Sequence, residues 1–485
     1  MDLTHPSATE EPGEQWTALS PTERESFFTA IERHRKAAWR VTAVSAVGIV
    51  VAAFVVAVLM APLFYALLGL AFDVVNIVTP APNLLGDFMT FVDRVQSEPT
   101  PASVGRWVVW LSVAALPGLI VMSLVIVSLR RALITAAHFE SSGLATRSPD
   151  SSVLAEQRFV NVIQEMSIAA NLPAPSVRVA EATLINAAVF GHDEEHAIIV
   201  VSKGLLARMN RAEMQGVAAH LIASIADGDM RIGERAALTL AFFNLVSRFA
   251  TIMGDRGAGR SLLDIFKALL WPTRKNVQRL MEEVSEGFKS NEAPGAAQAE
   301  TLRDRIREGV KLVLGGPVIM TGFFGGIVNF AVLGPLLAFA WRQRKYMADA
   351  TAVRLTRDPD TLGGALEEIS SAGGGGVLST WASHLSVSAA SSRSFLGGTA
   401  VPMFPSLERR LRALQKLGGT VQLRPSAVAR PPLKITILIT FLCSIVVVLV
   451  GVLLPLLVMV SMMLSMLFLG LPVGILHLLL RWIGG

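Results

Sequence analysis

The chain has 485 residues, of which 52% are hydrophobic and 17% charged, and its mean hydropathy is +0.52. Soluble domains carry about 25% charged residues, so the composition favours a membrane protein in contact with a lipid bilayer. The single cysteine, Cys443, excludes an intrachain disulfide framework and a zinc site built on cysteines. The net charge of +5 comes without a basic patch interleaved with aromatic residues, so no nucleic-acid partner is predicted.

The N-terminal part of the chain predicts two membrane spans behind a polar segment. Residues 1–42 begin with polar and acidic residues, which is not the pattern of a cleavable signal peptide. Residues 43–131 hold two apolar runs, Ala43–Phe72 and Trp107–Leu129, each long enough to cross a bilayer and joined by a short external loop. Lys and Arg residues precede the first run and follow the second, so the N-terminus and the domain after Arg131 are predicted to face the cytoplasm.

Further apolar runs follow later in the chain. Residues 235–341 hold two of them, Ala236–Gly254 and Leu312–Trp341, separated by a polar insert. These two runs either both span the membrane or both enter it and return, because the helices on either side of them must meet on one side. Residues 434–485 form a closing transmembrane hairpin around Pro455. About six spans are therefore predicted, in a multi-pass protein of the bacterial inner (cytoplasmic) membrane.

The stretch Arg211–Met230 has the spacing of a zinc-peptidase active-site helix. In the pattern H-E-x-x-H, two histidines four residues apart bind zinc and the glutamate activates water. Here the corresponding residues are His220, Leu221, Ile222, Ala223 and Ser224. One ligand position is kept, the general-base position is leucine and the second ligand position is serine. This fragment alone has little specificity, so the surrounding sequence must decide its meaning.

Upstream of this stretch, Leu172–Leu206 has a proline-flanked strand, the residues Asn186 and Ala187, then Gly191 and a second strand. The approach to His220 is matched by Glu213, Met214, Val217, Ala219 and, after the histidine, Asp229. These features resemble the HtpX-like integral-membrane zinc metallopeptidase family, which also holds the CAAX prenyl proteases. The resemblance covers roughly Phe159–Gly418 and implies a degenerate member of that family.

The downstream part of the similar region differs from the family at the positions of the zinc ligands. Arg342–Ile369 is similar to the helix that supplies the third zinc ligand in an E-x-x-A-D pattern, and Asp349 is present there. Lys345 stands where the family has the ligand glutamate. A later Thr-His-Pro-Pro motif reads Met403–Ser406 in this chain, so Phe404 replaces its histidine.

The resemblance implies an α-rich α+β membrane protein whose zincin-like peptidase domain comes in two parts, residues 132–234 and 342–433. We expect a small antiparallel sheet edge over Val177–Val201, packed on the helices of His220 and Lys345. Peptidase sheets bind extended substrates by adding a strand, which needs main-chain hydrogen bonds and no metal. The candidates for such a substrate groove are Asn186, Ala187, Ala188 and Val189.

Ligand chemistry decides what the departures mean. Catalytic zinc takes three protein ligands and a water molecule, and with Ser224 and Lys345 in place only His220 remains. Loss of a general base costs about a hundred- to ten-thousand-fold in rate, and Leu221 cannot relay a proton. The sequence therefore predicts no catalytic residue, no bound metal and no cofactor; zinc would return as cofactor only if the ligands were rearranged.

The remaining polar residues are expected to be structural. In related enzymes the carboxylate at the position of Asp349 orients the first zinc histidine, so a buried hydrogen bond between His220 and Asp349 is predicted. Lys345 lies four residues before Asp349 on the same helix face. We expect these three residues to form a compact cluster without metal, covered by Leu221 and Phe404. Asp229 is the other remnant of the family's surrounding shell.

A second histidine motif is a decoy. His192–His196 matches H-x-x-E-H, an inverted zinc motif that works only on a helix. Here it follows Gly191 and runs into the strand-like Ala197–Val201, which predicts a solvated, charged turn. Of the other histidines, His384 alone could approach the cleft, from a Ser/Ala-rich segment between two glycine-rich stretches.

Three functions remain open at this point. The favoured one is a membrane-embedded, proteolytically inactive pseudopeptidase that binds polypeptides or a partner protease, as an adaptor or regulator in membrane-protein quality control. The alternatives are an active zinc endopeptidase with rearranged ligands and a purely structural membrane scaffold. The expected partners are a membrane protease or a membrane-protein client, and self-association into a homo-oligomer is open.

Overall fold

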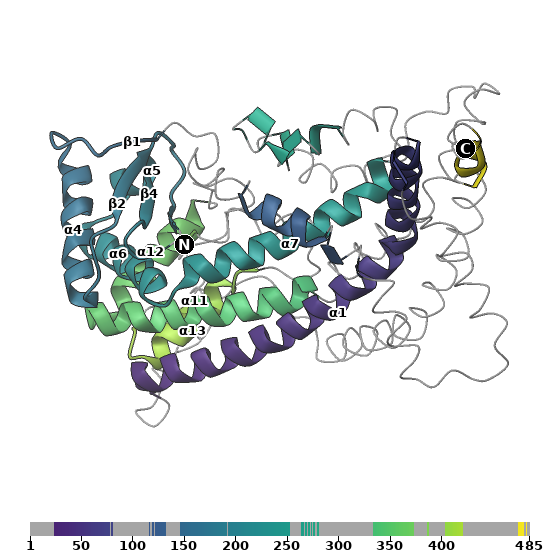
Figure 1. Ribbon diagram of the computed structural model, residues 1–485. Helices are drawn as coiled ribbons and strands as arrows, with labels where there is room; N and C mark the ends of the chain where they lie inside the picture. Colours follow the sequence, from purple (N-terminus) through teal and green to yellow (C-terminus); the bar gives the residue numbers. More distant parts are fainter. Residues whose placement is uncertain are drawn as a thin grey trace, which may run out of the picture.

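The computed structural model describes residues 24–77, 146–191, 193–252, 333–372 and 403–420 as continuous stretches. It also describes Ser386 and Val387 and scattered residues within 79–80, 116–131, 263–280 and 474–482. Figure 1 shows these parts as a mixed sheet at one end of the molecule, helices packed beside and below it, and one long helix that runs away from it.

The sheet has four strands in the spatial order β1-β2-β4-β3. Strand β1 (Thr146–Arg147) pairs antiparallel with β2 (Ser176–Ala180), and β2 pairs parallel with β4 (Ile198–Ser202). Strand β3 (Ala187–Phe190) pairs antiparallel with β4, in a register that places Ala187 opposite Val201. Strands in the predicted region are confirmed, but an all-antiparallel arrangement is wrong. Because β3 takes the edge position, β4 returns between β3 and β2 and runs in the direction of β2.

Eight helices with stated bounds accompany the sheet in the described part of the chain. In chain order they are α1 (Phe27–Asn76), α4 (Leu154–Ala170), α5 (Lys203–Arg208), α6 (Arg211–Ala226), α7 (Asp229–Ile252), α11 (Gly334–Thr356), α12 (Pro359–Ser371) and α13 (Leu407–Lys416). Helix α6 contacts α4, α11, α12 and strand β3. It therefore lies at the centre of the domain, where Figure 1 shows it among these elements.

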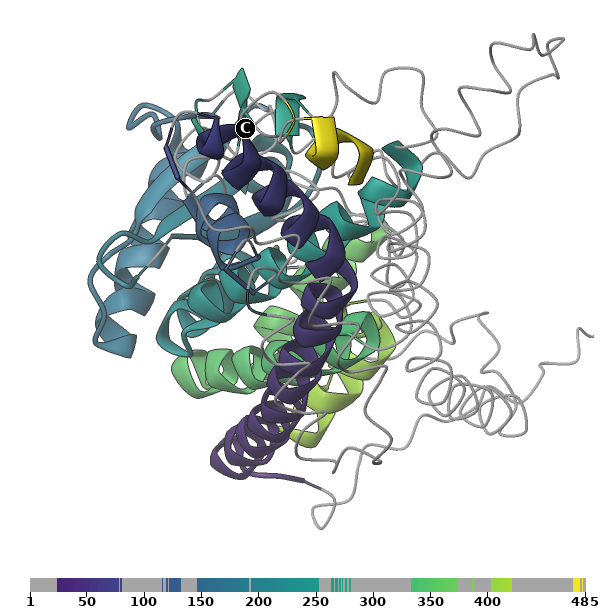
Figure 2. The same ribbon diagram turned by 45° about the vertical axis from the view of Figure 1, so that its right-hand side comes forward.

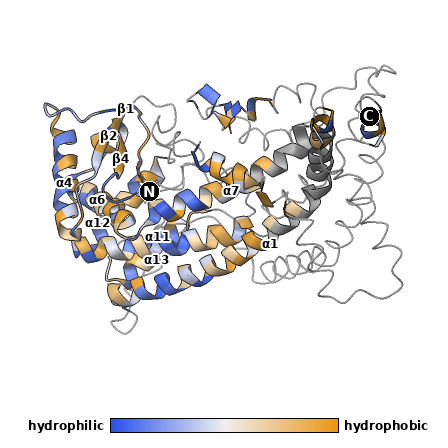
Figure 3. Ribbon diagram, in the orientation of Figure 1, coloured by the Kyte–Doolittle hydropathy of each residue, from blue (hydrophilic) through white to orange (hydrophobic). Residues whose placement is uncertain are grey.

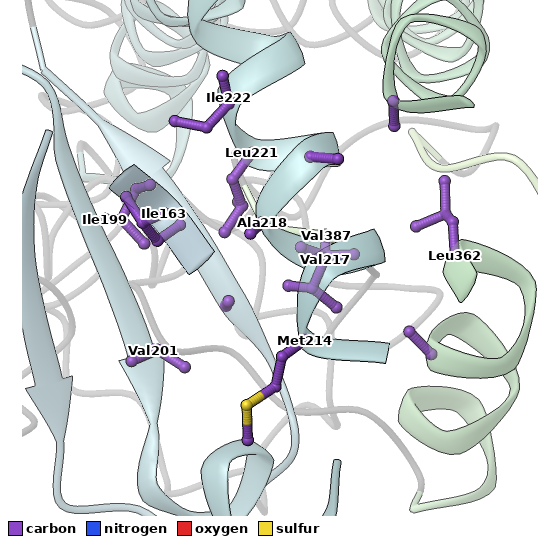
Figure 4. Packing of buried hydrophobic residues seen from close by; sticks show 14 of the residues in the cluster. Ile163, Ile199, Val201, Met214, Val217, Ala218, Leu221, Ile222, Leu362 and Val387 are labelled. Carbon is purple, nitrogen blue, oxygen red and sulfur yellow. The ribbon is translucent and has the colours of Figure 1, made fainter. Parts of the chain in front are cut away.

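The core is built around α6, which from Gly216 to Ile225 is predominantly apolar and buried on every side. A helix with that composition must be enclosed by other elements. Figure 4 shows Val217, Ala218 and Leu221 of α6 among apolar side chains from the sheet, α4 and α12. Leu221 and Ile222 are 1% and 0% exposed. Burial of a side chain of this size contributes about 1.5–3 kcal/mol, so α6 is held by packing rather than by its intrinsic helix propensity.

Two local features fix the first half of α6. Asn210 and Glu213 form a reciprocal capping box: the Asn210 side chain accepts from the Glu213 N–H at 3.0 Å, and Glu213 accepts from the Asn210 N–H at 2.9 Å. Further along, Gly216 lies so close to α12 that a Cβ atom there would meet the backbone nitrogen of Leu362 at 2.6 Å. Only glycine permits α6 and α12 to pack at this distance.

Helix α1 lies along α11 in both views of the molecule (Figures 1 and 2). Figure 3 shows hydrophilic residues in its part beside α13, followed by hydrophobic ones. The first expected span, 43–72, falls within this continuous helix. In the part of the chain that the structure describes, no helix meets the length and hydropathy needed to cross a membrane. The closing hairpin of 434–485 and the run 312–341 lie largely outside the described residues.

Candidate functional site

A buried ionic cluster lies where α6, α11 and α13 meet. Nδ1 of His220 on α6 is 2.9 Å from Oδ1 of Asp349 on α11, and both side chains are fully or almost fully buried. The predicted proximity of these two residues is confirmed. Arg410 on α13 donates to both oxygens of the same carboxylate, from Nε at 2.8 Å and from Nη2 at 2.6 Å. Asp349 therefore holds the histidine on one side and a bidentate guanidinium on the other.

Arg410 was not predicted to belong to this cluster. The sequence around it, Leu407–Lys416, is rich in arginine, and composition alone cannot say which arginine turns inward. A periodic signal was available: Arg410 lies four residues before Leu414 and therefore shares its helix face. Both residues are buried, whereas Arg412 is exposed.

The charges of the cluster are set by burial and by its neighbours. Burial lowers the pKa of His220 to about 4, against the opposing effect of Asp349. Burial also acts to raise the pKa of Asp349, but the charge and hydrogen bonds of Arg410 outweigh it and hold that pKa well below its usual range. At neutral pH the cluster thus consists of a neutral imidazole, a carboxylate and a guanidinium.

Lys345, at the position of the family's third ligand, is 1% exposed and carries its own set of contacts. Its Nζ donates to the main-chain oxygen of Ser386 at 2.8 Å. The ammonium also lies 5.6 Å from the ring centres of Trp341 and Phe404, a cation–π distance. Burial lowers the pKa of Lys345 to about 8. The predicted closeness of Lys345 and Phe404 is confirmed, but a direct pair with Asp349 is not found, because Arg410 occupies that carboxylate.

The family's trailing aspartate has a structural partner. Asp229 accepts from Nε of Arg344 at 2.5 Å, and the same guanidinium donates to the main-chain oxygen of Asp227. Oδ2 of Asp227 accepts from Thr351 at 3.2 Å. Burial and the charge of Asp229 raise the pKa of Asp227 to about 6. These contacts tie the end of α6 and the start of α7 to α11.

The general-base and second-ligand positions lie in the core. Leu221 belongs to the apolar cluster that α6 shares with the sheet (Figure 4). Ser224 is 2% exposed, and its Oγ has no hydrogen-bond partner among the described residues. The same holds for Nε2 of His220.

These residues do not fit a catalytic zinc ion. Zinc in such a site needs three nitrogen, oxygen or sulfur ligands, and the third position here holds the ammonium of Lys345, whose charge repels a dication. Asp349 already has both oxygens bound to Arg410. Among the residues that the structure describes, no group of three His, Asp, Glu or Cys side chains could hold a metal.

The remaining candidates are placed as follows. Ala187, Ala188 and Val189 lie in the edge strand β3 and are almost fully buried. Asn186, directly before the strand, is also buried, and its Oδ1 accepts from the Ala187 N–H at 2.9 Å. Asp193–His196 forms a turn in which Nδ1 of His196 lies 2.7 Å from Asp193, as predicted for a charged turn. His192 and His384 lie outside the described residues.

The mixed sheet and the buried α6–α11 pair define a metallopeptidase-like domain whose metal positions are altered. The model of the family "Peptidase family M48" matches residues 154–418, and the chain belongs to this family.

Curated relatives agree with this assignment. "Protease HtpX homolog" of Dictyoglomus turgidum is 30% identical over 210 residues, 43% of this chain and 53% of that protein. The protein with the same description in Thermoanaerobacter pseudethanolicus is 27% identical over 278 residues, 56% of this chain and 75% of that protein. The chain spans about half the length of the first of these relatives. No solved structure matches the chain.

Proposed function

We propose that this M48 member is a pseudopeptidase that binds extended polypeptide without cleaving it. The observation that carries the proposal is the ammonium of Lys345 at the third-ligand position, buried and hydrogen-bonded to the main chain of Ser386. A metal dication in the same place would have to displace that cation and break its contact. With Leu221 at the general-base position, no carboxylate is available there to activate water.

The retained part of the domain supports a binding role. Strand β3 is the last strand in the sheet order, and strand addition to such an edge requires no metal. An unfolded segment of a membrane protein, or of a partner membrane protease, has free main-chain N–H and C=O groups that can pair with this edge. The protein would act as an adaptor or regulator in membrane-protein quality control, presenting such segments to an active protease.

The proposal includes a multi-pass location in the bacterial inner membrane, with the peptidase-like domain on the cytoplasmic side. It rests on the hydrophobic composition and the distribution of Lys and Arg around the apolar runs. Cysteines introduced at Asp150 or Thr420, in a Cys443→Ser background, should react with an impermeant maleimide only after the membrane is opened. Labelling from the periplasmic side of intact spheroplasts would contradict this orientation.

One observation favours the second candidate, a zinc endopeptidase with rearranged ligands. Nε2 of His220 and Oδ2 of Asp229 are buried and have no hydrogen-bond partner among the described residues. A metal bound to that nitrogen would satisfy it. The count of ligands argues against this candidate, because the described neighbours supply a serine and an ammonium where two further ligands are required.

Metal content and proteolysis decide between the two. The purified full-length chain, dialysed against a mild chelator, should hold well below one zinc per molecule and leave labelled casein uncleaved. It should nevertheless bind the casein, as measured by fluorescence anisotropy. Stoichiometric zinc that is lost in the His220→Ala variant, together with cleavage, would establish the second candidate instead.

A further inference from the structure

The edge of the sheet that would receive a peptide is paired with the chain itself. Ala188 of β3 forms an antiparallel bridge with Ser386, and the N–H of Val387 donates to the oxygen of Ala187 at 2.8 Å. Strand β3 is the last in the sheet order, so this pairing is on its outer side. Ser386 and Val387 thus stand where an added strand would lie.

Two buried cations hold the main chain of this pair. Lys345 donates from Nζ to the oxygen of Ser386 at 2.8 Å, and Arg410 donates from Nη1 to the oxygen of Val387 at 2.7 Å. Two successive carbonyl groups are therefore each bound by a charged donor, which forms a stronger hydrogen bond than a neutral one. Lys345 replaces a ligand of the lost metal site, and Arg410 is the residue that neutralises Asp349.

The side chain of Val387 adds an apolar contact. It is 0% exposed and lies in the core cluster beside Val217 and Ala218 of α6 (Figure 4). The residue that makes this core contact is thus a short, branched apolar one. The hydroxyl of Ser386, by contrast, has no hydrogen-bond partner among the described residues.

We infer that Ser386–Val387 is an internal occupant of the polypeptide site, and that Lys345 and Arg410 are the groups with which this site binds main-chain carbonyls. The inference rests on the proposed binding function and names its ligand class: an extended segment, antiparallel to β3, with a short or branched apolar residue at the position of Val387. All three polar contacts engage main-chain atoms, so a client segment can replace them one for one.

The two cations also restrict what can displace the occupant. A buried ammonium or guanidinium that loses its acceptor pays a large desolvation cost. A client must therefore bring its own carbonyl oxygens to Lys345 and Arg410 as Ser386–Val387 leaves. An extended polypeptide does this, whereas an apolar surface or a helix with its carbonyls already paired does not.

A reversible cross-link tests this inference in the full-length chain. Ala188 and Ser386 form the narrow, non-hydrogen-bonded kind of antiparallel pair, with Cα atoms about 4.5 Å apart, a separation that a disulfide accepts. In a Cys443→Ser background, the double variant Ala188→Cys/Ser386→Cys should form a disulfide on mild oxidation. The probe is a fluorescein-labelled ten-residue copy of residues 382–391, and its binding to the detergent-solubilised protein is followed by anisotropy.

The reduced double variant should bind the probe, and the oxidised form should bind it at least tenfold more weakly. The oxidised single variant Ala188→Cys, which cannot cross-link internally, should bind like its reduced form. A probe with aspartate in place of its valine should not bind. Separately, Val387→Pro removes the N–H that pairs with Ala187 and should tighten probe binding three- to tenfold, because the occupant competes less.

The outcomes separate the two proposals. No disulfide, or equal probe affinity before and after oxidation, would overturn the internal occupant while leaving peptide binding in place. Absence of probe binding in the reduced, oxidised and Val387→Pro proteins alike would overturn peptide binding itself, and this inference with it.

Discussion

The two halves of helix α6 differ in what their side chains do. The first half begins with the capping box of Asn210 and Glu213 and holds Gly216, which lies very close to α12. The second half holds His220, Leu221 and Ser224, where a zinc peptidase needs ligands and a base. The first half therefore carries residues that fix the packing of the helix, and the second half carries buried residues of which only His220 is an ordinary zinc ligand.

On the proposed function, the domain does not depend on a metal ion for its stability. A structural or catalytic ion binds several protein groups and contributes to folding. Here the bidentate pair of Arg410 and Asp349 joins α13 to α11, the Asp349–His220 contact joins α11 to α6, and Lys345 joins α11 to Ser386. Substitutions that break these contacts should therefore lower the free energy of unfolding.

The largest effect is expected at Arg410. Arg410→Met removes one partner of a buried ion pair and leaves the charge of Asp349 without its guanidinium, which costs about 3–5 kcal/mol in the free energy of unfolding. Arg412→Ala, on the exposed face of the same helix, removes only a surface pair with Glu408 and should cost under about 1 kcal/mol. Denaturant unfolding of both variants measures this; equal losses would show that the buried pair is not important.

The pH dependence of stability should come next. Because the pKa of His220 falls from 6.5 to about 4 on folding, the unfolded chain binds a proton between these values that the folded chain does not. The free energy of unfolding should therefore fall as the pH is lowered from 6.5 to about 4, by about 3 kcal/mol for this group. His220→Gln should flatten that slope, whereas His196→Gln, at an exposed position, should keep it. An unchanged slope in His220→Gln would assign the acid sensitivity to other groups.

The smallest of the three effects is expected at Gly216, in the first half of α6. Gly216→Ala places a methyl group against backbone atoms of α12, which cannot move as a side chain does, and overpacking of this kind costs about 1–3 kcal/mol. Gly364→Ala is the matched control on α12, because its Cβ would come no closer than 3.7 Å to the flexible side chain of Glu213. That control should be neutral or stabilising by up to about 1 kcal/mol. A thermal unfolding series that ranks the two variants the other way would contradict the close helix contact.

The sequence predicted the family, the strands around Val177–Val201 and the meeting of His220 with Asp349, because these depend on motifs with fixed spacing. It did not predict the parallel pairing of β2 with β4, since strand order depends on which strand takes the edge and not on hydrophobic periodicity. Nor did it predict that Arg410 would bind Asp349. That contact joins residues 61 positions apart, and the helix of Arg410 offers several arginines among which only the tertiary packing selects.

The pairing of Ser386 and Val387 with β3 could not be predicted from the sequence for a related reason. Ser386 and Val387 lie in a Ser/Ala-rich segment with weak periodicity, and their contacts are made through main-chain atoms. Side-chain identity therefore carries little information about the pairing. The sequence analysis expected that His384, in this segment, could approach the cleft, but it predicted no pairing with the sheet.

The long sequence separation of the cluster has a consequence for biogenesis. Strands β2–β4 and helices α4–α6 form one contiguous piece that is synthesised before α11 and α12, so α6 lacks two of its packing partners at that stage. Domains generally begin to fold in order of synthesis, and exposed apolar surface in a partial fold favours aggregation. The side of α6 that α11 and α12 cover therefore stays open in the nascent chain until those two helices have been synthesised. A chaperone or the bilayer surface would have to shelter α6 in that interval, so expression yield should depend on translation speed through the region between α7 and α11.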